Sequence, residues 1–230
     1  MGKRKYYMVL DTETVATARV PFDIAYTMID RKGNIVEQRN YFVDEVLNSE
    51  LVMYILSKDS FSKSKFDFYN QIKIEQPNNI MSFTNIAFEI ADVLEKTNCA
   101  VVAYNAAFDV RALNNFSNAM NLGDFFYSNV EIWDLLNIAL HSLCNSQNYV
   151  EFALLNNFIT EAGNIKTSAE AVFNYLLKGE KFVEEHTALA DSEIEARILQ
   201  ACFDRKKKLE KEYAGPIFNH PIWKEKMKLS

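Results

Sequence analysis

The sequence predicts an α/β domain in which a mixed β-sheet is flanked by helices. Three observations predict this class: an apolar run at residues 6–10 ends in acids, two more strand-like segments follow it, and helical and strand-like segments then alternate. This order is typical of a sheet that is covered by helices. The chain has 230 residues, of which 49% are hydrophobic, which is enough for one large domain.

The first strand is predicted at residues 6–14, which read YYMVLDTET. Its apolar half is typical of a central strand that is buried on both faces. Because side chains two positions apart share a face, Asp11 and Glu13 lie on the same face as Tyr7 and Val9. Two carboxylates beside a core repel each other, so we expect a positive group between them.

The next elements follow from composition and spacing. Residues 24–29 and 35–43 are predicted strands, joined by DRKGN, in which Gly33 and Asn34 suit a hairpin. Residues 44–81 contain one short predicted helix and a polar aromatic stretch that we interpret as a flap. A helix capped by Ser82 or Thr84 then precedes a strand at residues 100–104.

The second half is predicted to be mainly helical. We expect a helix at residues 106–120, a short strand at residues 129–133 and several helices as far as residue 211. This organisation predicts one domain over residues 1–212 and an irregular C-terminal tail over residues 213–230, which contains two prolines and a tryptophan.

Composition excludes several functional classes. A net charge of −6 argues against binding of nucleic acid or anionic membranes through bulk electrostatics. No apolar stretch approaches the ~18 residues of a membrane span. The cysteines are Cys99, Cys144 and Cys202, an odd number without CxxC spacing, which predicts free thiols and a cytoplasmic protein.

Two acids lie on predicted helix faces that are otherwise apolar. Asp109 and Asp191 each begin a stripe at helical spacing. The stripes contain Leu113, Phe116 and Met120 in the first case, and Ile194, Ile198 and Cys202 in the second. If these two acids met Asp11 and Glu13 at ~5 Å, each pair would repel by roughly 3 kcal/mol at an effective dielectric of ~20. Either the acids do not converge, or their pKa values rise, or cations such as Mg²⁺ or Mn²⁺ hold them.

Simpler interpretations of each acid remain open at this point. A single D-x-E after a strand often caps a turn. Asp109 and Asp191 both lie in the first turn of a predicted helix, where a carboxylate complements the helix dipole.

Three motifs occur in order along the chain: LDTET, AYNAAFDVRAL and HTALADSEIEARIL. Together they resemble the DEDD superfamily of 3′–5′ exonucleases over residues 6 to about 203. His186, five residues before Asp191, matches the histidine branch (DEDDh, DnaQ-like), which includes the proofreading subunit of the bacterial replicative polymerase. The tyrosine branch would need a tyrosine where this chain has Thr187.

This resemblance implies a fold and an activity. The fold is ribonuclease H-like, with a five-stranded sheet made of a three-strand antiparallel meander and two parallel strands. The activity is hydrolysis of phosphodiester bonds at the 3′ end of nucleic acid, with DNA favoured over RNA, releasing nucleoside 5′-monophosphates. A DNA polymerase or replication protein stays open as a partner, and no membrane is involved.

The resemblance also implies roles for particular residues. Two Mg²⁺ or Mn²⁺ ions would be held by Asp11, Glu13, Asp109 and Asp191, with Asp11 bridging them, and His186 would be the general base. Substrate-binding positions would be Thr12, Thr14, Asn105 and Phe108. Asp134 matches a recurrent acid of the family, and we interpret it either as structural or as a residue that supports the metal ligands.

One departure and three alternatives stand beside this interpretation. Val15 follows Thr14 where the family commonly has glycine. An exoribonuclease of the same family, or a non-catalytic module that binds nucleic acid or a polymerase, would use the same fold. A haloacid-dehalogenase-like phosphatase would need Asp in place of Glu13, and its later motif fails at Ser128.

Overall fold

A six-stranded mixed sheet forms the centre of the described part of the chain. The computed structural model describes residues 6–15, 19–58, 63–178, 182, 187–206 and 209. The strand order is β4-β3-β2-β1-β5-β6. The strands are β1 (Tyr6–Val15), β2 (Val20–Asp30), β3 (Ile35–Val43), β4 (Ile80–Met81), β5 (Ala100–Ala103) and β6 (Ile132–Asp134). β1, β2 and β3 form an antiparallel meander, whereas β5 and β6 run parallel to β1.

The sequence predicted the meander and the two parallel strands, but the strand count of five was wrong. The additional strand is β4, whose two residues pair in parallel with Phe42 and Val43 of β3. A strand of two residues has no periodicity that a sequence pattern could reveal. The other strands are confirmed, although β2 extends beyond the predicted residues 24–29 at both ends and β6 begins later than predicted.

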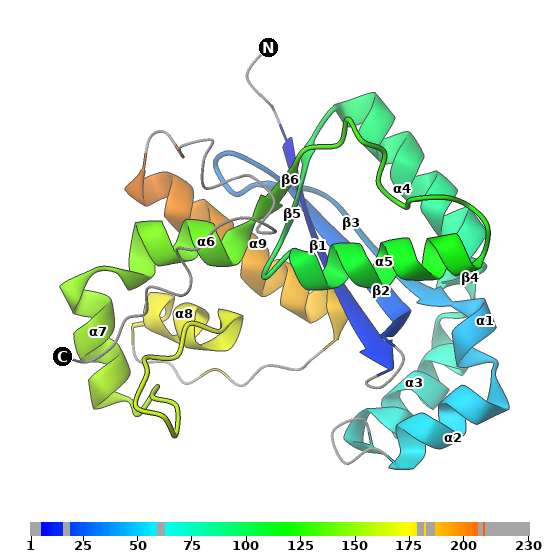
Figure 1. Cartoon of the computed structure of the whole chain (residues 1–230), viewed down its shortest axis with the longest axis horizontal. Coiled ribbons are helices and arrows are strands. Elements are labelled where there is room, and N and C mark those ends of the chain that lie inside the picture. The colour runs from blue at the N-terminus through cyan, green and yellow to red at the C-terminus, as the bar shows by residue number, and fades with distance from the viewer. Residues whose placement is uncertain are drawn as a thin grey trace.

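Helices cover both faces of the sheet (Figure 1). The helices are α1 (Asp44–Leu47), α2 (Glu50–Lys58), α3 (Lys63–Glu75), the 3-10 helix η1 (Pro77–Asn79), α4 (Phe83–Thr97), α5 (Ala107–Ala119), α6 (Leu135–Ala139), the π-helix η2 (Leu140–Cys144), α7 (Gln147–Leu155), α8 (Ala169–Leu176) and α9 (Ala188–Arg205). α4 and α5 pack on one face, and α6, α8 and α9 pack on the other. Of the two predicted caps of α4, Ser82 is the one that the structure shows, because its hydroxyl accepts a hydrogen bond from the Asn85 N–H.

The central strand β1 supplies side chains to two separate cores. Met8 and Leu10 belong to the core under α4 and α5, whereas Tyr7 and Val9 belong to the core under α8 and α9. This alternation is the period of two expected of a strand buried on both faces. As predicted, all three cysteines are free thiols, and each is buried.

The described residues of the segment 44–81, which sequence patterns left largely unassigned, form α1, α2, α3, η1 and β4. Figure 1 shows α2 and α3 side by side near the carboxyl end of β1. Tyr69 and Ile72 of α3 are buried in the core. The segment is therefore anchored to the sheet. The predicted tail, residues 213–230, lies outside the described residues.

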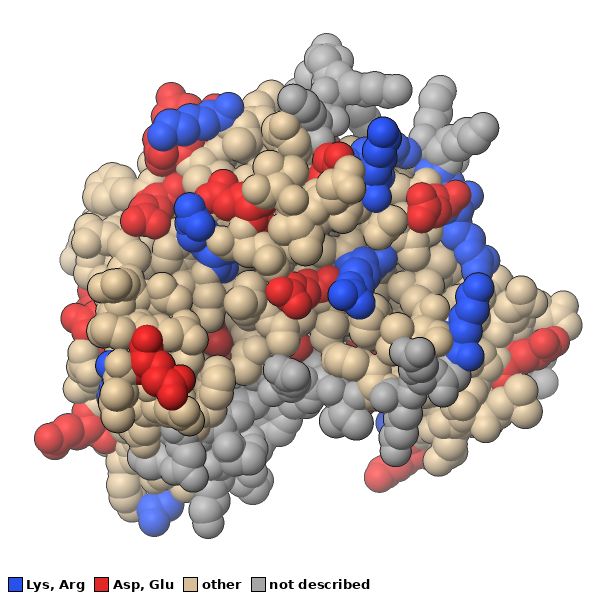
Figure 2. All heavy atoms as spheres, turned by 180° about the vertical axis from the view of Figure 1, so that it is seen from behind, with Lys and Arg blue, Asp and Glu red and all other residues tan. Residues whose placement is uncertain are grey.

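Charged side chains are mixed in sign on the surface. Figure 2 shows acidic and basic residues interspersed over much of the described face, with several Lys and Arg side chains in a row toward its right-hand side. Within the described residues, no helix is both long enough and apolar enough to cross a membrane.

The core assignment predicts the effect of two matched substitutions. Ile24→Ala removes a fully buried side chain of β2 and should lower the free energy of unfolding by about 2–5 kcal/mol. Ile35→Ala removes a side chain of β3 that is 57% exposed, and should change it by less than about 0.5 kcal/mol. Urea denaturation checks both values, and equal effects would contradict the assignment.

Candidate active site

The candidate site is built around the carboxyl-terminal half of β1. Asp11 and Glu13 are partly buried on the face that packs against α9, whereas Thr12 is buried and points to the other face. A register shift in the pairing with β2 occurs between Glu13 and Thr14. The strand thus presents two carboxylates and two hydroxyls at one edge of the sheet.

The second segment of the site is the start of α5. Asp109 lies in the first turn of this helix, is 3% exposed, and accepts a hydrogen bond of 2.8 Å from the Thr12 hydroxyl. The preceding loop contains Asn105 in the left-handed conformation, with φ of 61°. The contact between Thr12 and Asp109 brings together two of the motifs, which are 97 residues apart.

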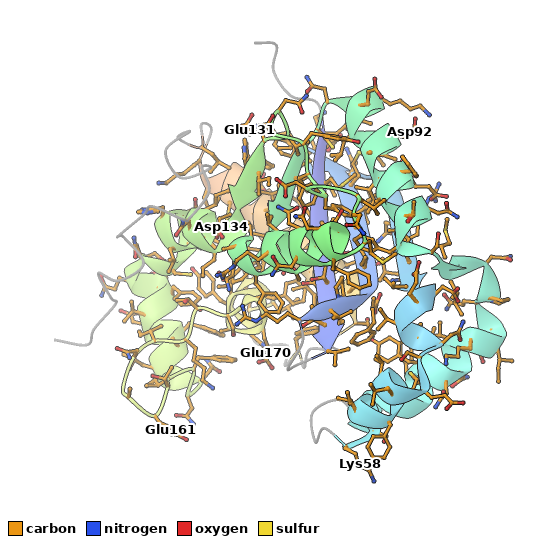
Figure 3. All side chains as sticks on the ribbon, turned by 45° about the vertical axis from the view of Figure 1, so that its right-hand side comes forward. Lys58, Asp92, Glu131, Asp134, Glu161 and Glu170 are labelled. Atoms are coloured by element: carbon orange, nitrogen blue, oxygen red, sulfur yellow. The ribbon has the colours of Figure 1, made fainter. Side chains whose placement is uncertain are left out.

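Asp134 holds the loop that leads into α5. Its Oδ2 accepts a hydrogen bond from the Ala106 N–H at 2.8 Å, and its Oδ1 caps α6 by accepting one from the Asn137 N–H at 3.1 Å. Figure 3 shows Asp134 in the interior near the start of α5, in contrast to peripheral residues such as Lys58 and Glu161. The structural role predicted for Asp134 is therefore supported by both contacts.

The third segment is the first turn of α9. Thr187 is the N-cap, and its side chain accepts a hydrogen bond from the Ala190 N–H. Asp191 follows in the first turn and is 8% exposed. One turn further on, Glu195 is buried, and its Oε2 accepts a hydrogen bond of 3.2 Å from the Tyr104 N–H. α9 is thereby joined to the end of β5.

The pKa shift of Asp11 indicates that acids from these three segments lie near one another. Burial raises the pKa of Asp11 well above its ordinary value, and the charges of Asp109, Glu195, Asp191 and Glu13 raise it further. Burial also raises the pKa of Asp109 to about 7, although the hydrogen bond from Thr12 opposes this shift. All four predicted acids therefore lie close enough to interact.

The donor chemistry of the site suits a hard divalent cation, because every candidate ligand is a carboxylate oxygen. As the side chains lie, however, the described residues contain no group of three or more His, Cys, Asp or Glu side chains that could hold a metal ion. Ion binding would need the carboxylates to turn toward a common centre. The carboxylate side chains and their mutual repulsion fit a bound cation. Their present orientations would have to change before they could bind it.

Of the remaining predicted residues, the structure describes all except one. His186 lies outside the described residues. Asn105 is exposed, and Phe108 is partly buried with the Arg19 guanidinium 5.7 Å from its ring centre. Thr14 is partly exposed at the end of β1. Asn105 and Phe108 thus flank the first turn of α5, near Asp109.

Sequence patterns did not single out two buried acids near the site, Glu195 and Asp23. Glu195 follows Asp191 by four positions and so shares its helix face. Asp23 lies between two buried apolar residues of β2, opposite Glu13, and burial raises its pKa to about 7. An acid inside an apolar strand was the signal that could have revealed Asp23.

These pKa values predict how stability depends on pH when divalent ions are removed with a chelator. The folded protein keeps the protons of acids such as Asp109 and Asp23 up to about pH 7, whereas the unfolded chain loses them near pH 4. The free energy of unfolding should therefore fall as pH rises from about 4 to about 7. Asp109→Asn should reduce that fall by on the order of 1–3 kcal/mol.

Denaturant titrations at several pH values measure this dependence. Asp204→Asn, a substitution of an exposed acid of α9, is the control and should leave the slope unchanged. Equal slopes for the wild type and Asp109→Asn would show that folding does not raise the pKa of Asp109.

Comparison with known proteins identifies the fold. No family model matches the sequence, and no curated protein matches it. E. coli exonuclease I in complex with a dA16 oligonucleotide is similar in structure, with a TM-score of 0.57 and 15% identity over 88% of this chain. Exonuclease X in complex with 5′ overhanging duplex DNA has a TM-score of 0.50 and 18% identity over 90% of this chain.

The chain covers 41% of that exonuclease I chain and 97% of the exonuclease X chain. It thus spans about two fifths of the length of the first and nearly all of the second. At these identities the likeness concerns the fold alone. The mixed sheet and its similarity to these structures confirm the predicted ribonuclease H-like fold.

Proposed function

We propose that the protein is a 3′–5′ exonuclease that hydrolyses phosphodiester bonds at the 3′ end of nucleic acid, with DNA favoured, and releases nucleoside 5′-monophosphates. One observation carries the proposal: Asp11 at the end of β1 interacts electrostatically with Glu13, with Asp109 of α5 and with Asp191 of α9. In this proposal, three separate motifs supply acids to one site. The two similar structures described above are exonucleases in complex with DNA, which supports this substrate.

The four acids would hold two Mg²⁺ or Mn²⁺ ions, which would supply Lewis acidity to the phosphodiester and lower the pKa of water. Asp11 lies on the central strand β1 and, by the resemblance to the exonuclease family, would contact both ions. Thr12 would fix one oxygen of Asp109 through its hydroxyl, so that the other oxygen stays available. The carboxylates contribute binding without competing as nucleophiles.

Other residues of the chain would handle the proton and the substrate. His186 would accept the proton of the attacking water at a ring nitrogen, because an unperturbed imidazole has a pKa of ~6.5. It lies two residues before Ala188, the first residue of α9. Thr14, Asn105 and Phe108 would contact the terminal nucleotide, and Phe108 offers a ring on which a base could stack.

Two related hypotheses use the same fold. An exoribonuclease would differ in how the site treats the 2′-hydroxyl. A non-catalytic module would bind nucleic acid or a DNA polymerase without hydrolysis. The presence of all four acids and of His186 favours a catalytic role, since a module that only binds has no need of them.

Hydrolysis of labelled oligonucleotides tests the proposal. A 5′-labelled single-stranded DNA should be shortened progressively from its other end in Mg²⁺ or Mn²⁺, and an identical RNA should be cut more slowly. Asp11→Asn and His186→Ala should each reduce the rate by roughly 100-fold or more, because one removes an ion-binding charge and the other the base.

Asp204→Asn, the exposed acid of α9 used above, is the matched control and should retain full activity. Faster RNA cleavage would support the exoribonuclease hypothesis. Tight DNA binding without release of nucleotides would support the non-catalytic module.

Ion binding has a readout that does not depend on activity. Millimolar Mg²⁺ or Mn²⁺ should raise the unfolding midpoint of the wild type by several degrees, because an ion that binds only the folded state stabilises it and relieves repulsion between the acids. Asp11→Asn should lose most of this rise in scanning fluorimetry, whereas Asp204→Asn should keep it. An equal rise in all three proteins would show that the ions bind elsewhere.

A further inference from the structure

Asp23 of β2 is a buried acid outside the set that would hold ions. It is 1% exposed and lies directly across from Glu13 in the antiparallel pair. A carboxylate in such a position is unfavourable unless hydrogen bonds satisfy it. The hydrogen-bond donors of Asp23 therefore indicate its role.

Three elements other than its own strand donate hydrogen bonds to Asp23. The Asn40 side-chain amide of β3 donates to Oδ1 at 2.6 Å. The Tyr69 hydroxyl of α3 and the Ala188 backbone N–H of α9 both donate to Oδ2, at 3.1 Å and 3.2 Å. One oxygen atom thus joins α3 to the first residue of α9.

The direction of the Tyr69 hydroxyl is set by packing. Its ring is 1% exposed and lies edge-on against Phe22 at 4.9 Å and Phe42 at 6.1 Å between ring centres. A ring held in this way cannot move its hydroxyl without moving α3. The position of α3 is therefore transmitted to the oxygen that Ala188 contacts.

The contact at Ala188 bears on the candidate site. Ala188 begins α9, and Asp191 lies in the same turn, with its N–H bonded to the Thr187 carbonyl at 2.9 Å. Because the turn is one hydrogen-bonded unit, a shift of Ala188 also shifts Asp191. His186 precedes Ala188 by two positions in the chain.

We propose that Asp23 and Tyr69 are positioning residues, which hold the first turn of α9, and with it Asp191, in the place that hydrolysis requires. The inference rests on the exonuclease activity proposed above and extends it to α3, a helix with no assigned role. Neither residue touches the substrate in this account. Both act through the backbone N–H of Ala188.

Tyr69→Phe tests the inference because it removes one hydroxyl and leaves the packed ring. Tyr26→Phe is the matched control: Tyr26 is also fully buried, lies on β2, and donates a hydrogen bond of the same 3.1 Å length to a carboxylate, that of Glu37. Asp23→Asn is the second variant, since it keeps the size of the side chain and replaces one of its two acceptor oxygens with an N–H donor. Unfolding midpoints verify that all three variants are folded.

Two measurements are made on each protein. In hydrogen–deuterium exchange, Tyr69→Phe should speed exchange of the amides of residues 188–191 by roughly threefold to tenfold, with a larger effect for Asp23→Asn. In steady-state hydrolysis of a single-stranded DNA oligonucleotide with Mn²⁺, kcat should fall about tenfold while KM changes less than about twofold. Tyr26→Phe should match the wild type in both.

The outcomes separate this inference from the proposed function. If Tyr69→Phe equals Tyr26→Phe in exchange, or if exchange rises while kcat is unchanged, the positioning role is wrong. A fall in kcat/KM that comes only from a rise in KM, with kcat unchanged, would also overturn it, because that pattern indicates direct contact with the substrate. If the wild type releases no nucleotide, the exonuclease proposal fails, and with it the role in hydrolysis, while the exchange data still decide whether Asp23 couples α3 to α9.

Discussion

Electrostatic repulsion at the end of β1 is the constraint on which the site depends. Burial and four neighbouring carboxylates raise the pKa of Asp11, and three of these carboxylates come from α5 and α9. A fold that gathers acids in this way gives up stability unless protons or cations neutralise them. Such a cost is typical of functional sites, where perturbed titratable groups concentrate.

The topology explains how distant segments meet there. β5 runs parallel to β1 and beside it, so α5 begins at the same edge of the sheet at which β1 ends. α9 packs across β1 and β2 on the opposite face from α5, which brings its first turn to that edge. The acids therefore approach the site from both sides of the sheet.

A second set of buried acids holds the backbone around the first. Asp134 and Glu195 accept hydrogen bonds from backbone N–H groups in the loop before α5, which carries Asp109. Asp23 accepts one from the first residue of α9, which carries Asp191. Each helix that bears a candidate ligand is thus fixed at its start by a carboxylate from a different segment. Preorganisation of this kind is what a catalytic site needs from its surroundings.

Much of this arrangement could be predicted from local patterns. Asp109 and Asp191 were found because each begins an apolar helical stripe, and both are buried. The mixed sheet and its hairpin followed from the order of the elements, and the meander with two parallel strands followed from the resemblance to the exonuclease family. β4 is too short to show a period, and α3 alternates polar and aromatic residues without a clear apolar face, so neither could be assigned.

The contacts between segments lie beyond such patterns. That the Thr12 hydroxyl meets Asp109, or that Tyr69 meets Asp23, depends on how elements far apart in the chain pack, and no local spacing encodes it. Glu195 was missed because acidic, basic and apolar residues are mixed along α9, so one more acidic residue there did not stand out.

Anomalous scattering from crystals grown with Mn²⁺ tests the central claim most directly. The account predicts two peaks ~3.5–4 Å apart, with Asp11 in contact with both and with Glu13, Asp109 and Asp191 as the other protein ligands. Peaks that lie only on exposed acids such as Asp204, with nothing beside Asp11, would contradict it.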